Sequence, residues 1–200
     1  MKRCIPLLAL FLLFAAETAS ARFVTYKEEF YRLFHTHHNR TPDNYIENIY
    51  WLEQALNAPF ANPLHALTRI ENEVQWEKYR YLFMMHVNIR LAEQHMFLGN
   101  MWNKRNAFFF NAPFREPILS SLEIAETSFR AALFYWGEAL AWLERLDNPS
   151  FRWLNLQQVQ FWEDEAHRIR NGQFNYARTI NRELRLLQQV RERFQAMEAN

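Results

Sequence analysis

The sequence predicts an all-α fold, a multi-helix bundle of long antiparallel helices with a long C-terminal helix. Hydrophobic residues make up 50% of the 200 residues, whereas glycine occurs only 3 times, which leaves few positions for tight hairpins. Apolar side chains recur every three or four positions over long stretches, and proline or Asn/Asp clusters separate these stretches. Packing of helix pairs as in tetratricopeptide repeats stays open, although no such repeat period extends along the chain.

The first 21 residues have the pattern of a secretory signal peptide. Lys2 and Arg3 precede an apolar run over residues 5–16, and the small residues 19–21 fit a cleavage site. We expect cleavage after Ala21 and a single all-helical domain over residues 22–200 in the periplasm. The one cysteine lies before the apolar run, so we expect no lipid anchor and a mature chain without cysteine.

Helix signals divide the first part of the chain. A helix is expected over residues 25–34, followed by a polar loop over residues 35–40. Thr41 then fits an N-cap with Pro42 in the first helical position. This second helix ends before the turn that starts at Asn57.

The middle of the chain contains the most apolar helix, expected over residues 63–98. Asn62 is its expected N-cap, and Gly99 is expected to end it. An irregular segment over residues 101–117 leads to a fourth long helix over residues 118–146.

The last helix is expected to run from residue 151 almost to the C-terminus, because the apolar spacing keeps its phase across Gly172. About 45 residues at 1.5 Å each exceed the length of a compact bundle, so residues 172–200 are expected to form a projecting arm. Arg178, Arg182 and Arg185 lie on this arm. A solvated helix face, a docking arm for a partner or a second copy, and contact with anionic lipid all stay open.

A buried polar network is expected inside the most apolar helix. His86, Arg90 and Glu93 lie three and four residues apart among apolar neighbours, and buried polar groups need partners. A ligand pocket around these residues is the alternative.

No sequence motif assigns a catalytic residue, a metal site or a cofactor. His35, His37 and His38 are the main candidates for metal ligands, but no further ligand stands at a readable spacing, so we expect them on an exposed loop. Residues 163–165 are expected to be an exposed acidic turn. The net charge of +1 does not favour binding to nucleic acid.

One connecting segment is unusually aromatic. It contains Trp102, Phe108, Phe109, Phe110 and Phe114. Three consecutive phenylalanines cannot all point inward from a short connection. Either the segment folds over the end of the bundle, or some of its rings anchor a partner protein.

Four sequence blocks resemble a known family. NPLHAL (62–67), WEKYRYLFMMH (76–86), AFFFNAPF (107–114) and SLEIAE (121–126) are similar to a family of small exported helical proteins of spirochaetes. The resemblance implies a component of the periplasmic flagellar collar, an assembly of helical scaffold proteins around the motor, and it brings no catalytic motif.

These observations favour a non-enzymatic scaffold that binds other periplasmic or envelope proteins, with a homo-oligomer through the C-terminal helix as one form of assembly. The alternatives are a metal- or ligand-binding helical bundle, centred on His86, Arg90 and Glu93 or on the histidine loop, and a periplasmic chaperone that holds clients on exposed aromatic side chains.

Overall fold

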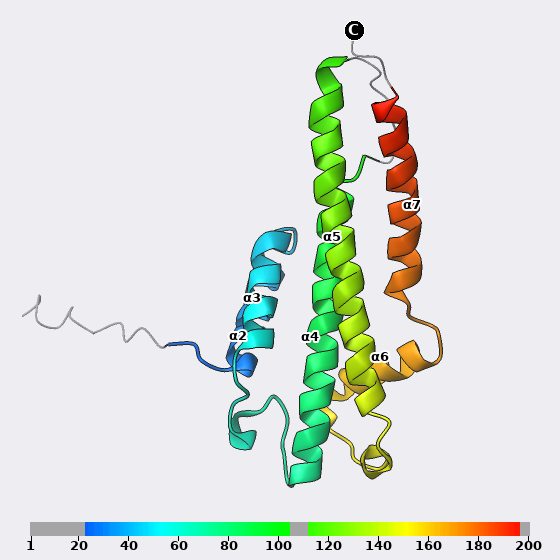
Figure 1. Ribbon diagram of the computed structural model, residues 1–200. Coiled ribbons are helices and arrows are strands. Elements are labelled where there is room, and N and C mark those ends of the chain that lie inside the picture. Colours follow the sequence, from blue (N-terminus) through cyan, green and yellow to red (C-terminus); the bar gives the residue numbers. More distant parts are fainter. Residues whose placement is uncertain (1–22, 105–111, 197–200) are drawn as a thin grey trace, which may run out of the picture.

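The computed structural model describes residues 23–104 and 112–196 (Figure 1). This part of the chain forms helices and contains no β-strand, which confirms the predicted all-α bundle. The α-helices are α2 (Lys27–Arg40), α3 (Tyr45–Asn57), α4 (Glu73–Trp102), α5 (Ala112–Arg145), α6 (Gln160–Arg170) and α7 (Tyr176–Gln195). Three short 3₁₀-helices are η1 (Pro63–His65), η2 (Pro149–Phe151) and η3 (Gln157–Val159). None of these helices combines the length and the apolar character that crossing a membrane requires.

The antiparallel pair of α4 and α5 forms the centre of the molecule, with α2 and α3 on one side and α7 on the other (Figure 1). The buried face of α5 repeats at alternating steps of three and four residues, as in a coiled-coil seam. Small and large side chains alternate along it, which lets neighbouring helices approach closely. These buried residues are Leu122, Ala125, Phe129, Ala132, Trp136, Ala139 and Leu143.

Gly99 does not end α4, contrary to the prediction, since the helix continues to Trp102. A Cβ atom at Gly99 would lie 2.7 Å from a ring carbon of Phe129. Glycine is therefore needed at this position for the close approach of α5, and it does not act as a helix stop.

The boundaries of the first helices also differ from the prediction. Residues 35–40 are helical, and α2 ends at Arg40 with basic side chains in its last turn, where they suit the helix dipole. The N-cap of α3 is Asn44, whose side chain accepts a hydrogen bond from the Glu47 backbone N–H; Thr41 instead follows the end of α2.

The predicted helix over residues 63–98 begins ten residues later than expected. Asn62 caps only η1. The N-cap of α4 is Asn72, whose side-chain oxygen accepts a hydrogen bond from the Gln75 backbone N–H at 2.9 Å. Asparagine is a favourable N-cap at both positions. The long helix begins at the later one, Asn72, because the chain leaves helical geometry after residue 65.

The C-terminal region is not one continuous helix. Gly172 adopts a φ of +68°, which is unfavourable for other residues, and it separates α6 from α7. Instead of projecting, α7 packs antiparallel to α5 over residues 176–195 (Figure 1). The prediction of a projecting arm is therefore wrong for the described residues, because the apolar face of α7 is covered by α5. The buried apolar residues of α7 are Ile180, Leu187, Val190 and Phe194.

Candidate functional site

His86 lies at the centre of a hydrogen-bonded group inside the bundle, with 1% of its surface exposed. Its Nε2 is 2.7 Å from the Tyr31 hydroxyl, and its Nδ1 is 2.5 Å from a carboxylate oxygen of Glu165. Burial lowers the pKa of His86 and raises the pKa of Tyr31, so the imidazole is neutral and the phenol keeps its proton. The ring therefore donates Nδ1–H to Glu165 and accepts the Tyr31 proton at Nε2.

Arg90 extends this group across the bundle. Its guanidinium pairs with Glu165 and, at 2.7 Å, with Glu93. The Tyr176 hydroxyl donates to the other oxygen of Glu93 at 3.0 Å. Burial raises the pKa of Glu165, but the hydrogen bonds from His86 and Arg90 have the larger combined effect. The pKa of Glu165 therefore lies below its usual value. We call these six residues the polar network: Tyr31, His86, Glu165, Arg90, Glu93 and Tyr176.

The polar network brings together the three residues that the sequence singled out, but His86 and Arg90 meet through Glu165. The partners missed from sequence are Tyr31, Glu165 and Tyr176, which lie on α2, α6 and α7. Glu165 is not part of an exposed acidic turn, because its side chain is only 12% exposed. Its position three residues after Trp162, on the buried stripe of α6, is a signal that could have identified it.

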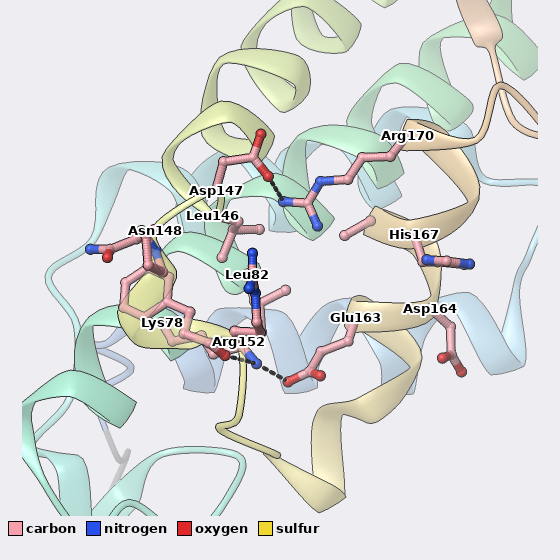
Figure 2. Close-up of a pocket in the computed structure, with 13 residues that line it drawn as sticks. Lys78, Leu82, Leu146, Asp147, Asn148, Arg152, Glu163, Asp164, His167 and Arg170 are labelled. Atoms are coloured by element: carbon pink, nitrogen blue, oxygen red, sulfur yellow. Dashed lines mark hydrogen bonds and ion pairs between the residues drawn. The ribbon is translucent and has the colours of Figure 1, made fainter.

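A surface cavity of about 460 Å³ lies between α4, the segment after α5, and α6 (Figure 2). Its volume lies in the range of small-molecule sites. Residues of its lining form two ion pairs: Lys78 with Glu163 at 2.8 Å, and Arg170 with Asp147 at 2.9 Å. The buried Lys78 ammonium also donates to the backbone carbonyls of Phe151 and Leu154. The charges of the lining thus hold α6 and the segment after α5 in place.

The three candidate histidines lie on α2, and two of them, His37 and His38, contact the same residue, Asn48. His37 Nδ1 is 2.9 Å from the side-chain oxygen of Asn48, and its Nε2 is 2.8 Å from the Glu47 carboxylate. His38 contacts the amide nitrogen of Asn48 at 3.3 Å. They lie on the end of a helix, not on the expected loop. Within residues 23–104 and 112–196, no group of three or more His, Cys, Asp or Glu residues is placed to hold a metal ion.

Large apolar side chains are exposed where α3 meets α4. The rings of Tyr45 and Phe97 lie 5.8 Å apart, centroid to centroid, and connect the two helices. The exposed fractions are 68% for Ile46, 50% for Tyr50 and 50% for Met101. Ile46 and Tyr50 share one face of α3, as Phe97 and Met101 share one face of α4, because four residues make about one helical turn. We call these residues the apolar strip: Tyr45, Ile46, Tyr50, Phe97 and Met101.

Trp102 lies at the end of α4, next to the apolar strip, and is partly exposed. The other aromatic residues proposed as anchors are not placed. Phe108, Phe109 and Phe110 lie outside the described residues, and the side chain of Phe114 does too.

The arginines proposed for partner binding share the outer face of α7. Arg178, Arg182 and Arg185 are exposed, because the opposite face of α7 is buried against α5. These arginines lie on α7, on the other side of the α4–α5 pair from α2 and α3 (Figure 1).

Comparison with known proteins gives one match. Residues 74–197 match the model of a family described as a domain of unknown function (DUF8513). No curated protein and no solved structure is detectably similar to the chain. The matched region begins at the start of α4 and includes α5, α6 and α7, whereas α2 and α3 lie outside it.

Proposed function

The chain belongs to the DUF8513 family, and we propose that it is a non-enzymatic scaffold that binds other proteins. The observation that carries the proposal is the apolar strip. The contact between Tyr45 and Phe97 joins the exposed apolar side chains of α3 to those of α4, and exposed apolar surfaces commonly serve as contacts to other molecules. Aromatic side chains and methionine are also enriched at protein interfaces.

The position of the apolar strip supports a role in docking. It lies across two helices that are already joined by packed side chains, so a partner would meet a surface formed before binding. Because little backbone has to be ordered at the moment of contact, more of the contact energy remains as affinity. The polar network adds to this rigidity by connecting α4 to three other helices.

The proposed partners are periplasmic or envelope proteins, because residues 1–21 have the pattern of a cleaved signal peptide. The resemblance of four sequence blocks to small exported spirochaete proteins supports an assembly such as the flagellar collar. Analysis of the N-terminus of the protein recovered from its native cells tests export directly: a mature chain that begins at Arg22 is expected.

Substitution of the apolar strip tests the proposal. We expect Ile46→Ser combined with Met101→Ser to remove the partners that are crosslinked to the parent protein in native cells and quantified by mass spectrometry. Both side chains are at least half exposed, so their removal is expected to change the free energy of unfolding by less than about 0.5 kcal/mol each. A thermal melt of each purified variant checks this point.

Trp153→Ser is the matched control, because Trp153 is 89% exposed and lies after η2, outside the apolar strip. The control is expected to keep all partners. If the strip variant keeps the same partners as the control, the strip is not an interface. If the parent protein is recovered alone with a bound small molecule, the ligand-binding alternative replaces the scaffold.

A further inference from the structure

The outer face of α7 presents a line of exposed arginines that we call the arginine stripe: Arg178, Arg182, Arg185 and Arg193. Their spacing of four, three and eight residues keeps them on one side of the helix. The line spans about 22 Å at 1.5 Å per residue. Because Ile180, Leu187, Val190 and Phe194 are buried on the other side, the packing of α7 fixes the direction in which the arginines point. Helix α7 lies at the edge of the bundle (Figure 1), and all four arginines are exposed.

The arginine stripe has little compensating charge. Only Arg182 reaches a carboxylate, that of Glu183 at 3.2 Å, and the other three form no ion pair with any described residue. Exposed arginines elsewhere differ: Arg69 pairs with Glu71 and Arg170 with Asp147, whereas Arg32 and Arg152, for example, form no ion pair with a described residue.

The local environment of α7 makes the uncompensated charge unfavourable in the free protein. Arginines three and four residues apart repel one another along a helix. Arg178 also lies in the first turn of α7, which contains no acidic residue, and a cation there opposes the helix dipole. An anionic partner would add attractive interactions that offset these repulsions.

A groove beside the arginine stripe extends the positive surface onto α5. It has a volume of about 370 Å³, and its lining includes Arg130 and Arg185. The one carboxylate in it, Glu126, already binds Arg130 at 2.6 Å and Arg191 at 2.5 Å. The hydrogen bond from Arg130 and that from Arg191 lower the pKa of Glu126, so Glu126 is ionised and is already paired with two guanidinium groups.

We propose that the arginine stripe and this groove bind an acidic segment of a partner protein. Guanidinium groups match carboxylates with two parallel hydrogen bonds, and Asn181 in the groove can bind a peptide backbone. Anionic lipid fits less well, because a helix that lies in a membrane surface inserts its apolar face, and that face of α7 is buried against α5. The inference rests on the proposed function, since it names the chemistry of one scaffold partner.

A pair of synthetic peptides of about 20 residues tests the inference with the purified protein. One carries glutamate every three or four positions, and in the other each glutamate is replaced by glutamine. We expect the acidic peptide alone to bind, as followed by fluorescence anisotropy. Arg178→Glu combined with Arg185→Glu is expected to weaken binding roughly tenfold or more. Because Arg178→Glu suits the helix dipole, the thermal midpoint of this variant should not fall.

Arg32→Glu combined with Arg69→Glu makes the same change in net charge away from α7, and it is expected to alter the affinity less than about twofold. Equal binding of both peptides, or equal weakening by this control, would overturn the inference. Binding to phosphatidylglycerol vesicles but not to the acidic peptide, with the same dependence on Arg178 and Arg185, would identify a lipid surface instead.

Crosslinking in native cells shows whether the acidic-segment proposal alone fails or the proposed scaffold function fails with it. If the Arg178 and Arg185 variant keeps all partners while the apolar strip variant loses some, the inference fails and the scaffold remains. If neither variant loses a partner, the proposed function fails as well.

Discussion

Individual buried histidines are held neutral by the fold. His95 on α4 stacks on Tyr135, with the ring centroids 5.4 Å apart. Both ring nitrogens of His95 are buried without a hydrogen-bond partner among the described residues. Burial lowers its pKa to about 4, because a charged imidazolium would lose its hydration there.

This shift predicts acid sensitivity that depends on His95. Between about pH 6.5 and pH 4 the unfolded chain takes up a proton at this position and the folded chain does not. The free energy of unfolding therefore decreases as the pH is lowered through this range, by up to about 1.4 kcal/mol per pH unit for one such histidine. His95→Phe should remove this contribution and stabilise the protein more at about pH 5 than at about pH 7.5, as measured by urea unfolding.

An equal effect of His95→Phe at both pH values would contradict the prediction. The variant should still lose some stability in acid, because burial also lowers the pKa of His86.

At the scale of the helices, the sequence predicted Thr41 and Asn62 as N-caps of long helices, and the structure uses Asn44 and Asn72 instead. Asn62 and Asn72 both cap a helix, yet only Asn72 begins a long one. The two glycines outside the α4–α5 contact show the same dependence on context. Gly137 lies within α5 with open space around it, and Gly172 has a positive φ between α6 and α7.

Substitutions at these two glycines should therefore have opposite effects. Gly137→Ala is expected to raise the free energy of unfolding by about 0.5–1 kcal/mol, because alanine is the better helix former. Gly172→Ala is expected to lower it by about 1 kcal/mol, because of the left-handed backbone. Urea unfolding of both variants measures the difference. A stabilising Gly172→Ala would mean that the helix runs unbroken through residue 172.

At the scale of the whole molecule, the polar network connects helices that are far apart in the sequence. It joins α4 to α2, α6 and α7 through charged and hydrogen-bonded groups in the interior. Removal of one partner from a buried charge pair leaves the other charge without compensation, which costs more than the pair itself contributes.

Glu165→Gln tests this connection. It leaves Arg90 with one carboxylate and changes the partner of His86 from an anion to an amide. We expect a loss of about 2–4 kcal/mol in the free energy of unfolding, a range reduced from that of fully buried pairs because Arg90 is 28% exposed. Asp147→Asn is the control, since Asp147 and Arg170 form a pair at the surface, and it should cost about 0–1 kcal/mol. Equal losses of unfolding free energy in the two variants would show that the polar network stabilises the fold no more than a surface ion pair does.

The whole-molecule arrangement also bears on the proposed function. The apolar strip lies on α3 and α4, and the arginine stripe lies on α7, on the other side of the α4–α5 pair (Figure 1). One molecule could therefore contact two partners through surfaces of different chemistry, which a scaffold requires.

Side-chain spacing predicted the all-α class and the apolar faces of the main helices, because both depend on the order of residues within one segment. The sequence also identified His86, Arg90 and Glu93, since charged groups in an apolar helix need partners. Three features could not be predicted in this way: Gly172 separates two helices, Glu165 completes the polar network, and the arginines of α7 point outward. The contacts that place Glu165 and the start of α7 join residues 79 and 83 positions apart, and no local pattern specifies such contacts.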